Sequence, residues 1–158
     1  MKKLIFLLCI VFLASACNNN LSSQPEPIKI SAPYLVKITT SGGLCQYGLC
    51  EAEYVISIAG ELEKTYHKLI SENKYEKVTE TVKINSSDYQ LLKTQITNTN
   101  FQKIIDSKFT EICPIVYDGS QHLFSFYPTN TEIILDSCKQ IIEVEKDPFK
   151  LIYQLIFK

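Results

Sequence analysis

The sequence is most constrained at Ser41-Gly42-Gly43-Leu44-Cys45-Gln46-Tyr47-Gly48-Leu49-Cys50, which contains three glycines, two cysteines and no charged residue. Residues 34–40 before it and residues 51–59 after it alternate between apolar and polar side chains. Alternation with a period of two is typical of half-buried strands, and glycines let the backbone turn between them. We therefore expect two antiparallel strands joined by this stretch, the second with its core face formed by Ala52, Tyr54, Ile56 and Ile58.

A second pair of strands is expected directly after the first. Gly60 and Glu61 mark a turn, residues 63–70 form a weak strand, and residues 75–84 form a clearer one. One face of this last strand consists of Val78, Val82 and Ile84. Four strands joined by short turns predict an antiparallel meander.

Helices are expected after the meander and at the end of the chain. Ser87 and Gln90 have the spacing of a capping box, and a helix to about Thr97 would bury Tyr89, Leu92 and Ile96. Asp147 is expected to cap a last helix with Pro148 at its first position, and the apolar face of this helix is Phe149, Ile152, Leu155 and Ile156.

The region between these helices is less regular. Residues 101–109 fit a helix or a strand, residues 110–120 form a loop, and the strand-like runs after it are 122–127, 131–136 and 141–144. The expected fold is one α+β domain over residues 34–158, with an antiparallel sheet of four to six strands packed by two helices.

Residues 1–16 have the features of an export leader. Lys2 and Lys3 precede an apolar run, Leu4 to Leu13, that is too short to span a bilayer. Ala14-Ser15-Ala16-Cys17 resembles the lipobox of bacterial lipoproteins, in which the leader is cleaved before an acylated cysteine. The alternative is an ordinary signal peptide cleaved after Ala16. We expect acyl chains such as palmitate on Cys17 to anchor the protein in a membrane.

The segment after the lipobox predicts a tether and a location. Residues 17–33 are polar, contain prolines and lack periodicity, as flexible linkers do. Asn18 follows the cysteine, and by resemblance to lipoprotein sorting this favours the outer membrane in bacteria that have one. The expected location is the bacterial cell envelope.

The charge pattern limits the classes of partner. Without the leader, 14 lysines face 17 acidic residues, and the chain has neither arginine nor tryptophan. Nucleic-acid binding needs a concentrated basic surface, and phosphate sites favour arginine. We expect no nucleic-acid partner, but a membrane contact through the lipid and a protein partner.

Four cysteines remain once the leader is removed and Cys17 is acylated. They are Cys45, Cys50, Cys113 and Cys138. An even number in an exported domain favours two disulfides. Three pairings are possible, and we favour Cys45–Cys50 within the glycine turn together with Cys113–Cys138. A redox pair is disfavoured because no C-x-x-C occurs, and a zinc site because no histidine lies nearby.

Few residues match catalytic or metal-binding patterns. His67 and His122 each lie in an expected strand, outside any such motif. Asp118 and Asp136 flank the second hairpin and would suit acid–base or calcium chemistry if close, but Asp118-Gly119 is first a turn signal. We expect no catalytic residue, no cofactor and no metal.

Two loops of low charge, residues 41–50 and 110–120, form the expected binding surface. Disulfide-pinned loops with apolar and tyrosine tips suit binding, because little entropy is lost when they dock. The alternative is that these side chains cap the end of the core. The candidate residues are Ser41, Gly42, Gly43, Leu44, Tyr47, Leu49, Ile115, Tyr117 and Asp118.

Several motifs support a family resemblance over residues 34–158. They are S-G-G-x-C-x-x-G-x-C from Ser41 to Cys50, Cys113-Pro114-x-x-Tyr117-Asp118-Gly119, the aromatic strand Phe124–Tyr127, and Ser137-Cys138. This set resembles a family of uncharacterised bacterial exported and lipoprotein domains, which implies no particular activity. The strand ending in Thr40-Ser41-Gly42-Gly43 is similar to emfourin, an inhibitor of thermolysin-like metallopeptidases, although this chain differs in its cysteines and export signal.

Three functions follow from these features, in order of preference. The first is a non-enzymatic, lipid-anchored binding module that uses the two loops, with peptidase inhibition as one form of it. The second is a structural envelope lipoprotein that interacts with another envelope component. The third is an enzyme that uses Asp118 and Asp136.

Overall fold

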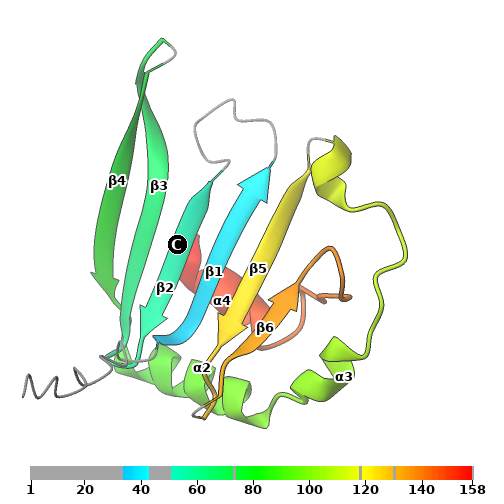
Figure 1. Ribbon diagram of the computed structural model, residues 1–158. Helices are drawn as coiled ribbons and strands as arrows, with labels where there is room; N and C mark the ends of the chain where they lie inside the picture. The colour runs from blue at the N-terminus through cyan, green and yellow to red at the C-terminus, as the bar shows by residue number, and fades with distance from the viewer. Residues whose placement is uncertain (1–33, 43–50, 73, 118, 130, 158) are drawn as a thin grey trace, which may run out of the picture. The chain divides into compact units, whose positions relative to one another are not determined.

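The computed structural model describes residues 34–42, 51–72, 74–117, 119–129 and 131–157. Within these ranges a six-stranded antiparallel sheet has the order β4-β3-β2-β1-β5-β6, accompanied by three α-helices (Figure 1). The expected α+β class and number of strands are confirmed, but there is one more helix than expected. The additional helix, α3 (Phe101–Ile105), comes from the stretch that fitted either a helix or a strand.

The first four strands form the expected meander. They are β1 (Tyr34–Gly42), β2 (Ala52–Ser57), β3 (Glu61–Ser71) and β4 (Lys74–Lys83), and each pairs with the next in chain order. An antiparallel pair needs only a turn between its strands, so short connections produce this order. Gly60 has a φ of 77°, the left-handed conformation that favours glycine in the turn before β3.

The last two strands extend the sheet from its other side. β5 (Ser120–Phe126) pairs with β1, and β6 (Ile133–Asp136) pairs with β5. The chain between β4 and β5 contains α2 (Ser86–Asn98), α3 and the short 3-10 helix η1 (Pro114–Tyr117). Consequently β1 lies inside the sheet, while β4 and β6 form its two edges.

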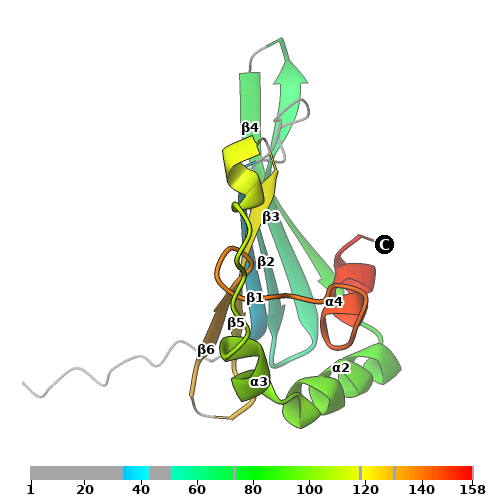
Figure 2. The same ribbon diagram turned by 90° about the vertical axis from the view of Figure 1, so that its right-hand side faces the viewer.

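The hydrophobic core lies between one face of the sheet and the helices. Figure 2 shows α2 and α4 (Phe149–Ile156) on the same side of the sheet, which we call the covered face. The ring of Phe149 packs edge-on against Phe124 at 5.1 Å between centroids. Burial of each large side chain stabilises the fold by about 1.5–3 kcal/mol. The most buried are Val36, Ile56, Leu62, Leu92, Ile96, Phe124, Phe126, Leu135 and Ile152.

Two local expectations in the first half are wrong. Ile58 does not face the core but is 56% exposed, because β2 ends at Ser57 and Ile58 lies in the following turn. The N-cap of α2 is Asn85, whose side-chain oxygen accepts a hydrogen bond from the Asp88 N–H at 2.8 Å. Ser87 is instead the first-turn residue whose hydroxyl donates to Asn85 at 2.8 Å.

Two further expectations near the C-terminus are also wrong. Residues 141–144 form no strand; Ile141 and Val144 are both exposed in an irregular segment that leads to α4. Pro148, and not Asp147, is the N-cap residue of α4. Asp147 instead accepts a hydrogen bond from the Gln95 side chain at 2.7 Å, so it links the start of α4 to α2. None of the helices in the described ranges has the length and apolar character that crossing a membrane requires.

Candidate functional site

A disulfide fixes the loop that precedes β5. Cys113 and Cys138 are joined, as expected, with their Cα atoms 5.0 Å apart. Cys113 lies immediately before η1, and Cys138 lies just after β6. The bond therefore ties η1 to the far strand of the same hairpin and limits its movement.

The end of β1 packs against this same loop. Gly42 has a φ of 81°, and a Cβ placed there would lie 2.5 Å from Ile115 Cγ1 and 2.9 Å from the Gly119 carbonyl oxygen. Glycine is the residue that fits, because it accepts the left-handed backbone and leaves room for η1. In the β1–β5 register, Ser41 also lies opposite Gln121. The structure thus brings Ser41 and Gly42 together with the 110–120 loop.

Apolar side chains of this loop face solvent. Ile112, Ile115 and Val116 are 59%, 38% and 65% exposed, respectively, and we call these three residues the apolar tip. The three lie within residues 112–116, and contiguous exposed apolar patches are a feature of contact surfaces. The backbone of Tyr117 completes η1.

Other predicted residues lie outside the described part of the chain. These are the lipidation site, most of the glycine-cysteine stretch and one of the two aspartates: Cys17, Gly43, Leu44, Cys45, Tyr47, Leu49, Cys50 and Asp118. The expectations for the Cys45–Cys50 pair and for an Asp118–Asp136 pair therefore stay predictions.

Asp136 is nearly buried and fully engaged in local hydrogen bonds. Its Oδ1 accepts from Gln121 Nε2 at 2.8 Å and from the Cys138 N–H at 2.9 Å, and Lys139 Nζ lies 3.4 Å from Oδ2. Burial alone would raise the pKa of this carboxyl, but the hydrogen bonds with Gln121, Cys138 and Lys139 lower it below its usual value. An ionised, fully bonded carboxylate holds the turn after β6 in place.

The two histidines lie in strands, as the sequence predicts. His67 is half-buried in β3, opposite Lys77 of β4. His122 is half-buried in β5, with Nδ1 3.2 Å from Thr40 Oγ1 and the Tyr153 ring edge-on at 6.0 Å. Burial lowers the pKa of His122 below its usual value, which favours the neutral imidazole.

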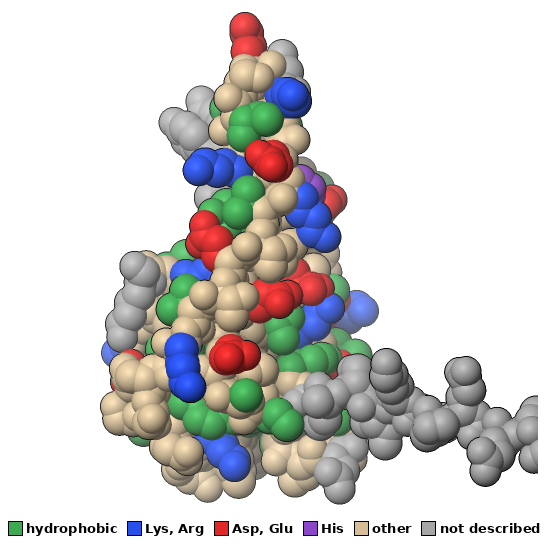
Figure 3. All heavy atoms as spheres, turned by 90° about the vertical axis from the view of Figure 1, so that its left-hand side faces the viewer, with side chains coloured by type: hydrophobic (Ala, Val, Ile, Leu, Met, Phe, Trp, Pro, Cys, Tyr) green, Lys and Arg blue, Asp and Glu red, His purple; other side chains and the backbone are tan. Residues whose placement is uncertain are grey.

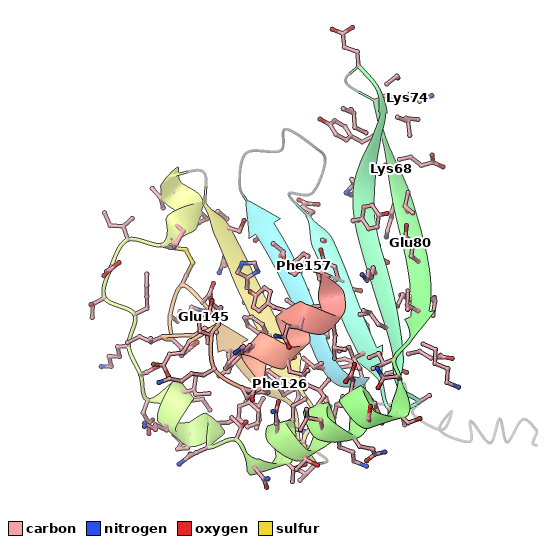
Figure 4. The ribbon with its side chains drawn as sticks, turned by 180° about the vertical axis from the view of Figure 1, so that it is seen from behind. Lys68, Lys74, Glu80, Phe126, Glu145 and Phe157 are labelled. Carbon is pink, nitrogen blue, oxygen red and sulfur yellow. A yellow bond between two sulfur atoms is a disulfide. The ribbon has the colours of Figure 1, made fainter. Side chains whose placement is uncertain are left out.

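His122 contributes to an open hollow of about 570 Å³ beside α4, which sequence reasoning missed. Its lining residues are His122, Val144, Glu145, Lys150, Tyr153, Gln154 and Phe157. Figure 4 labels Glu145 before α4 and Phe157 at its end. Tyr153 and Phe157 stack at 5.8 Å, and burial raises the pKa of Tyr153 to about 12. The sequence did contain one signal for this wall: Tyr153 and Phe157 are four residues apart, and residues with this spacing share a helix face.

The hollow combines aromatic, imidazole and charged side chains. It offers a neutral imidazole, an aromatic wall and one charged residue of each sign at Glu145 and Lys150. Across the ranges that the structure describes, no group of three His, Cys, Asp or Glu side chains is arranged to hold a metal ion.

Comparisons with known proteins add no family assignment. A scan against protein-family models found no matching model, and a search of curated proteins found no match. The resemblances to exported lipoprotein domains and to emfourin therefore stay predictions.

Proposed function

We propose that this protein is a non-enzymatic binding module, lipid-anchored through Cys17 at the bacterial cell envelope, that docks a protein partner with its apolar tip. The observation that supports this most is the exposure of Ile112, Ile115 and Val116 on a turn held by the Cys113–Cys138 bond. A turn that is already ordered loses little conformational entropy on docking.

The contact of the tip with β1 adds to this argument. Because Ile115 packs against the position of Gly42, the tip is braced by the sheet as well as by the disulfide. Burial of Val116 in a partner's pocket would contribute about 1.5–3 kcal/mol, which corresponds to roughly a 10- to 140-fold change in affinity.

A thermolysin-like metallopeptidase is the partner to test first, because the end of β1 is similar to emfourin. The experiment titrates the peptidase with the full-length chain, with Val116→Asp and with Ile134→Asp. Ile134 is a matched control, since it is 59% exposed and lies on β6, away from η1. Stoichiometric inhibition that only Val116→Asp weakens supports inhibition through the tip.

Absence of inhibition excludes this class of partner. A photo-crosslinking residue placed at 116 or at 134 in intact cells then tests the binding module itself. A protein adduct formed from 116 and not from 134 supports docking through the tip. Equal adducts from both positions, or none, contradict it.

The second candidate is a structural envelope lipoprotein in which the tip only caps the sheet. The partial burial of Ile115 against β1 favours this alternative. Reduction of the Cys113–Cys138 bond distinguishes between the two proposed functions. Loss of partner binding with an unchanged sheet signal in circular dichroism supports docking, whereas unchanged binding supports the structural role.

A further inference from the structure

β4 is an exposed edge of the sheet. Within the described ranges it pairs with β3 alone, and all of its residues are exposed except Val78, which is half-buried. Figure 3 looks at this edge and shows acidic and basic side chains along it. Figure 1 shows the β3–β4 hairpin extending beyond the other strands, so the helices leave much of it uncovered.

The outward-facing backbone groups of this edge can be identified from the register. The Ile84 N–H donates to the Gly60 carbonyl at 2.9 Å, and Leu62 lies opposite Val82. Hydrogen-bonded and non-hydrogen-bonded pairs alternate along an antiparallel ladder. The residues that direct N–H and C=O groups away from β3 are therefore Tyr75, Lys77, Thr79, Thr81 and Lys83.

Between residues 76 and 83 the charged side chains of β4 separate by face, whereas Lys74 at the start of the strand shares the face of Glu76. Glu76 and Glu80 share the covered face, while Lys77 and Lys83 share the opposite, open face. β3 has the reverse arrangement: Lys64 lies opposite Glu80, Lys68 lies opposite Glu76, and Glu61 lies opposite Lys83. Figure 4 labels Lys68 and Glu80 on this hairpin. Opposite charges directly across a sheet stabilise the pairing.

We propose that the free edge of β4 binds an extended segment of a partner protein as an added antiparallel strand. That segment carries basic and apolar residues on the side of Glu76 and Glu80, and acidic residues on the side of Lys77 and Lys83. Main-chain hydrogen bonds provide affinity, and the two charged faces select orientation and sequence. This site is separate from the apolar tip and does not depend on the function proposed above.

The charge pattern argues against a second copy of the chain as the occupant. Residues that face each other in an antiparallel pair lie on the same side of the sheet. Two copies of β4 would therefore place Glu76 and Glu80 of both copies on one face, and Lys77 and Lys83 of both on the other. Like charges that come directly opposite each other destabilise a pairing and opposite charges stabilise it, so this pattern favours a partner segment with the complementary charges over a second β4.

The chain's own β3 provides a probe with the required pattern. A capped peptide of residues 61–71, ELEKTYHKLIS, in the β3 register places Lys64 and Lys68 opposite Glu80 and Glu76 on one face and Glu61 opposite Lys83 on the other. Exchange of every Glu and Lys gives KLKETYHELIS, which has the same composition and net charge but the opposite facial pattern. In titrations of the full-length chain in mild detergent, we expect the first peptide to bind at least about tenfold more tightly at low salt, with the difference shrinking as salt rises.

Two variants at Thr81 distinguish the contribution of the backbone N–H to peptide affinity from the contribution of the side chain. Thr81→Pro removes an outward N–H, and proline is tolerated where a strand's N–H faces solvent. Thr81→Val keeps the N–H and replaces the hydroxyl with a methyl group of similar size. We expect Thr81→Pro to weaken binding of the native-pattern peptide about tenfold or more and Thr81→Val to leave it within about twofold. Circular dichroism on both variants checks that the sheet is retained.

Three results of the titrations would overturn the proposal. They are absence of binding by either peptide, equal binding by the two peptides, and equal affinities for Thr81→Pro and Thr81→Val. Self-association that Thr81→Pro abolishes in sedimentation would assign the edge to a second copy and so would also contradict the proposed partner.

Discussion

Substitution of Gly42 tests whether the apolar tip is braced by the sheet. In Gly42→Ala, the left-handed φ of 81° carries one cost, and the new Cβ carries another, lying 2.5 Å from Ile115 Cγ1 and 2.9 Å from the Gly119 carbonyl oxygen. The first cost is about 1–2 kcal/mol for an L-residue. The second is about 1–3 kcal/mol, because a backbone oxygen cannot move aside as a flexible side chain can.

Gly60 provides a matched control for the backbone cost. Its φ is 77°, but a Cβ there would come no closer than 3.3 Å, to the Tyr89 ring. Gly60→Ala should therefore lower the free energy of unfolding by about 1–2 kcal/mol. Gly42→Ala should lower it by about 2–5 kcal/mol in urea unfolding followed by circular dichroism. The difference between the two variants measures the contact with the 110–120 loop.

A double-mutant cycle identifies the contributing group. Ile115→Ala removes the nearer contact but leaves the Gly119 carbonyl in place, so it should recover about 1 kcal/mol of the loss caused by Gly42→Ala. Equal losses for Gly42→Ala and Gly60→Ala, together with zero coupling to Ile115, would refute packing of the loop on β1. The bracing argument for the tip would then fail.

Three other predictions follow from single residues. The folded-state pKa of His122 lies below its usual value, so the unfolded chain binds more protons and the free energy of unfolding should fall as pH drops below about 6.5. His122→Gln should flatten this slope in pH-dependent unfolding, and an unchanged slope would contradict the assignment to His122. Asp136→Asn should lower the free energy of unfolding by about 1–3 kcal/mol at pH 7, because it weakens the bonds with Gln121, Cys138 and Lys139. Since the pKa of Asp136 is lowered in the folded protein, the difference in unfolding free energy between variant and parent should shrink as pH falls below about 4. A difference that stays constant with pH would contradict this. Cys17→Ala should abolish labelling by radioactive palmitate and release the protein from membranes, and labelling that persists would exclude a lipid at Cys17.

The strands were largely readable from sequence because their alternation has a physical cause. In β1 one face packs into the core and the other does not, so the buried Val36 and Ile38 alternate with the less buried Lys37 and Thr39. The rule fails at the ends of elements. Ile58 continues the alternation of β2 but lies beyond the last residue of the strand, where the turn exposes it.

The helix start was predicted two residues late because two polar residues compete for the cap. Ser87 has the capping-box spacing to Gln90, but Asn85 reaches the Asp88 N–H and also accepts from the Ser87 hydroxyl. Which residue caps depends on where the chain leaves β4, and that is decided by pairing with β3. The sequence pattern around Ser87 does not contain this information.

By itself, the sequence determined the α+β class, the order of the four-stranded meander and the buried faces of the helices, because these depend on local periodicity and short turns. Tertiary structure alone decided that β5 joins the free edge of β1 and leaves β4 exposed. The connection between β4 and β5 is long enough to allow β5 to pair at more than one position in the sheet. In the observed arrangement, Phe124 and Phe126 of β5 are buried in the core. That choice brings His122 beside Thr40 and η1 against Gly42. Contacts between residues so distant in sequence depend on packing of the whole core, which no local pattern encodes.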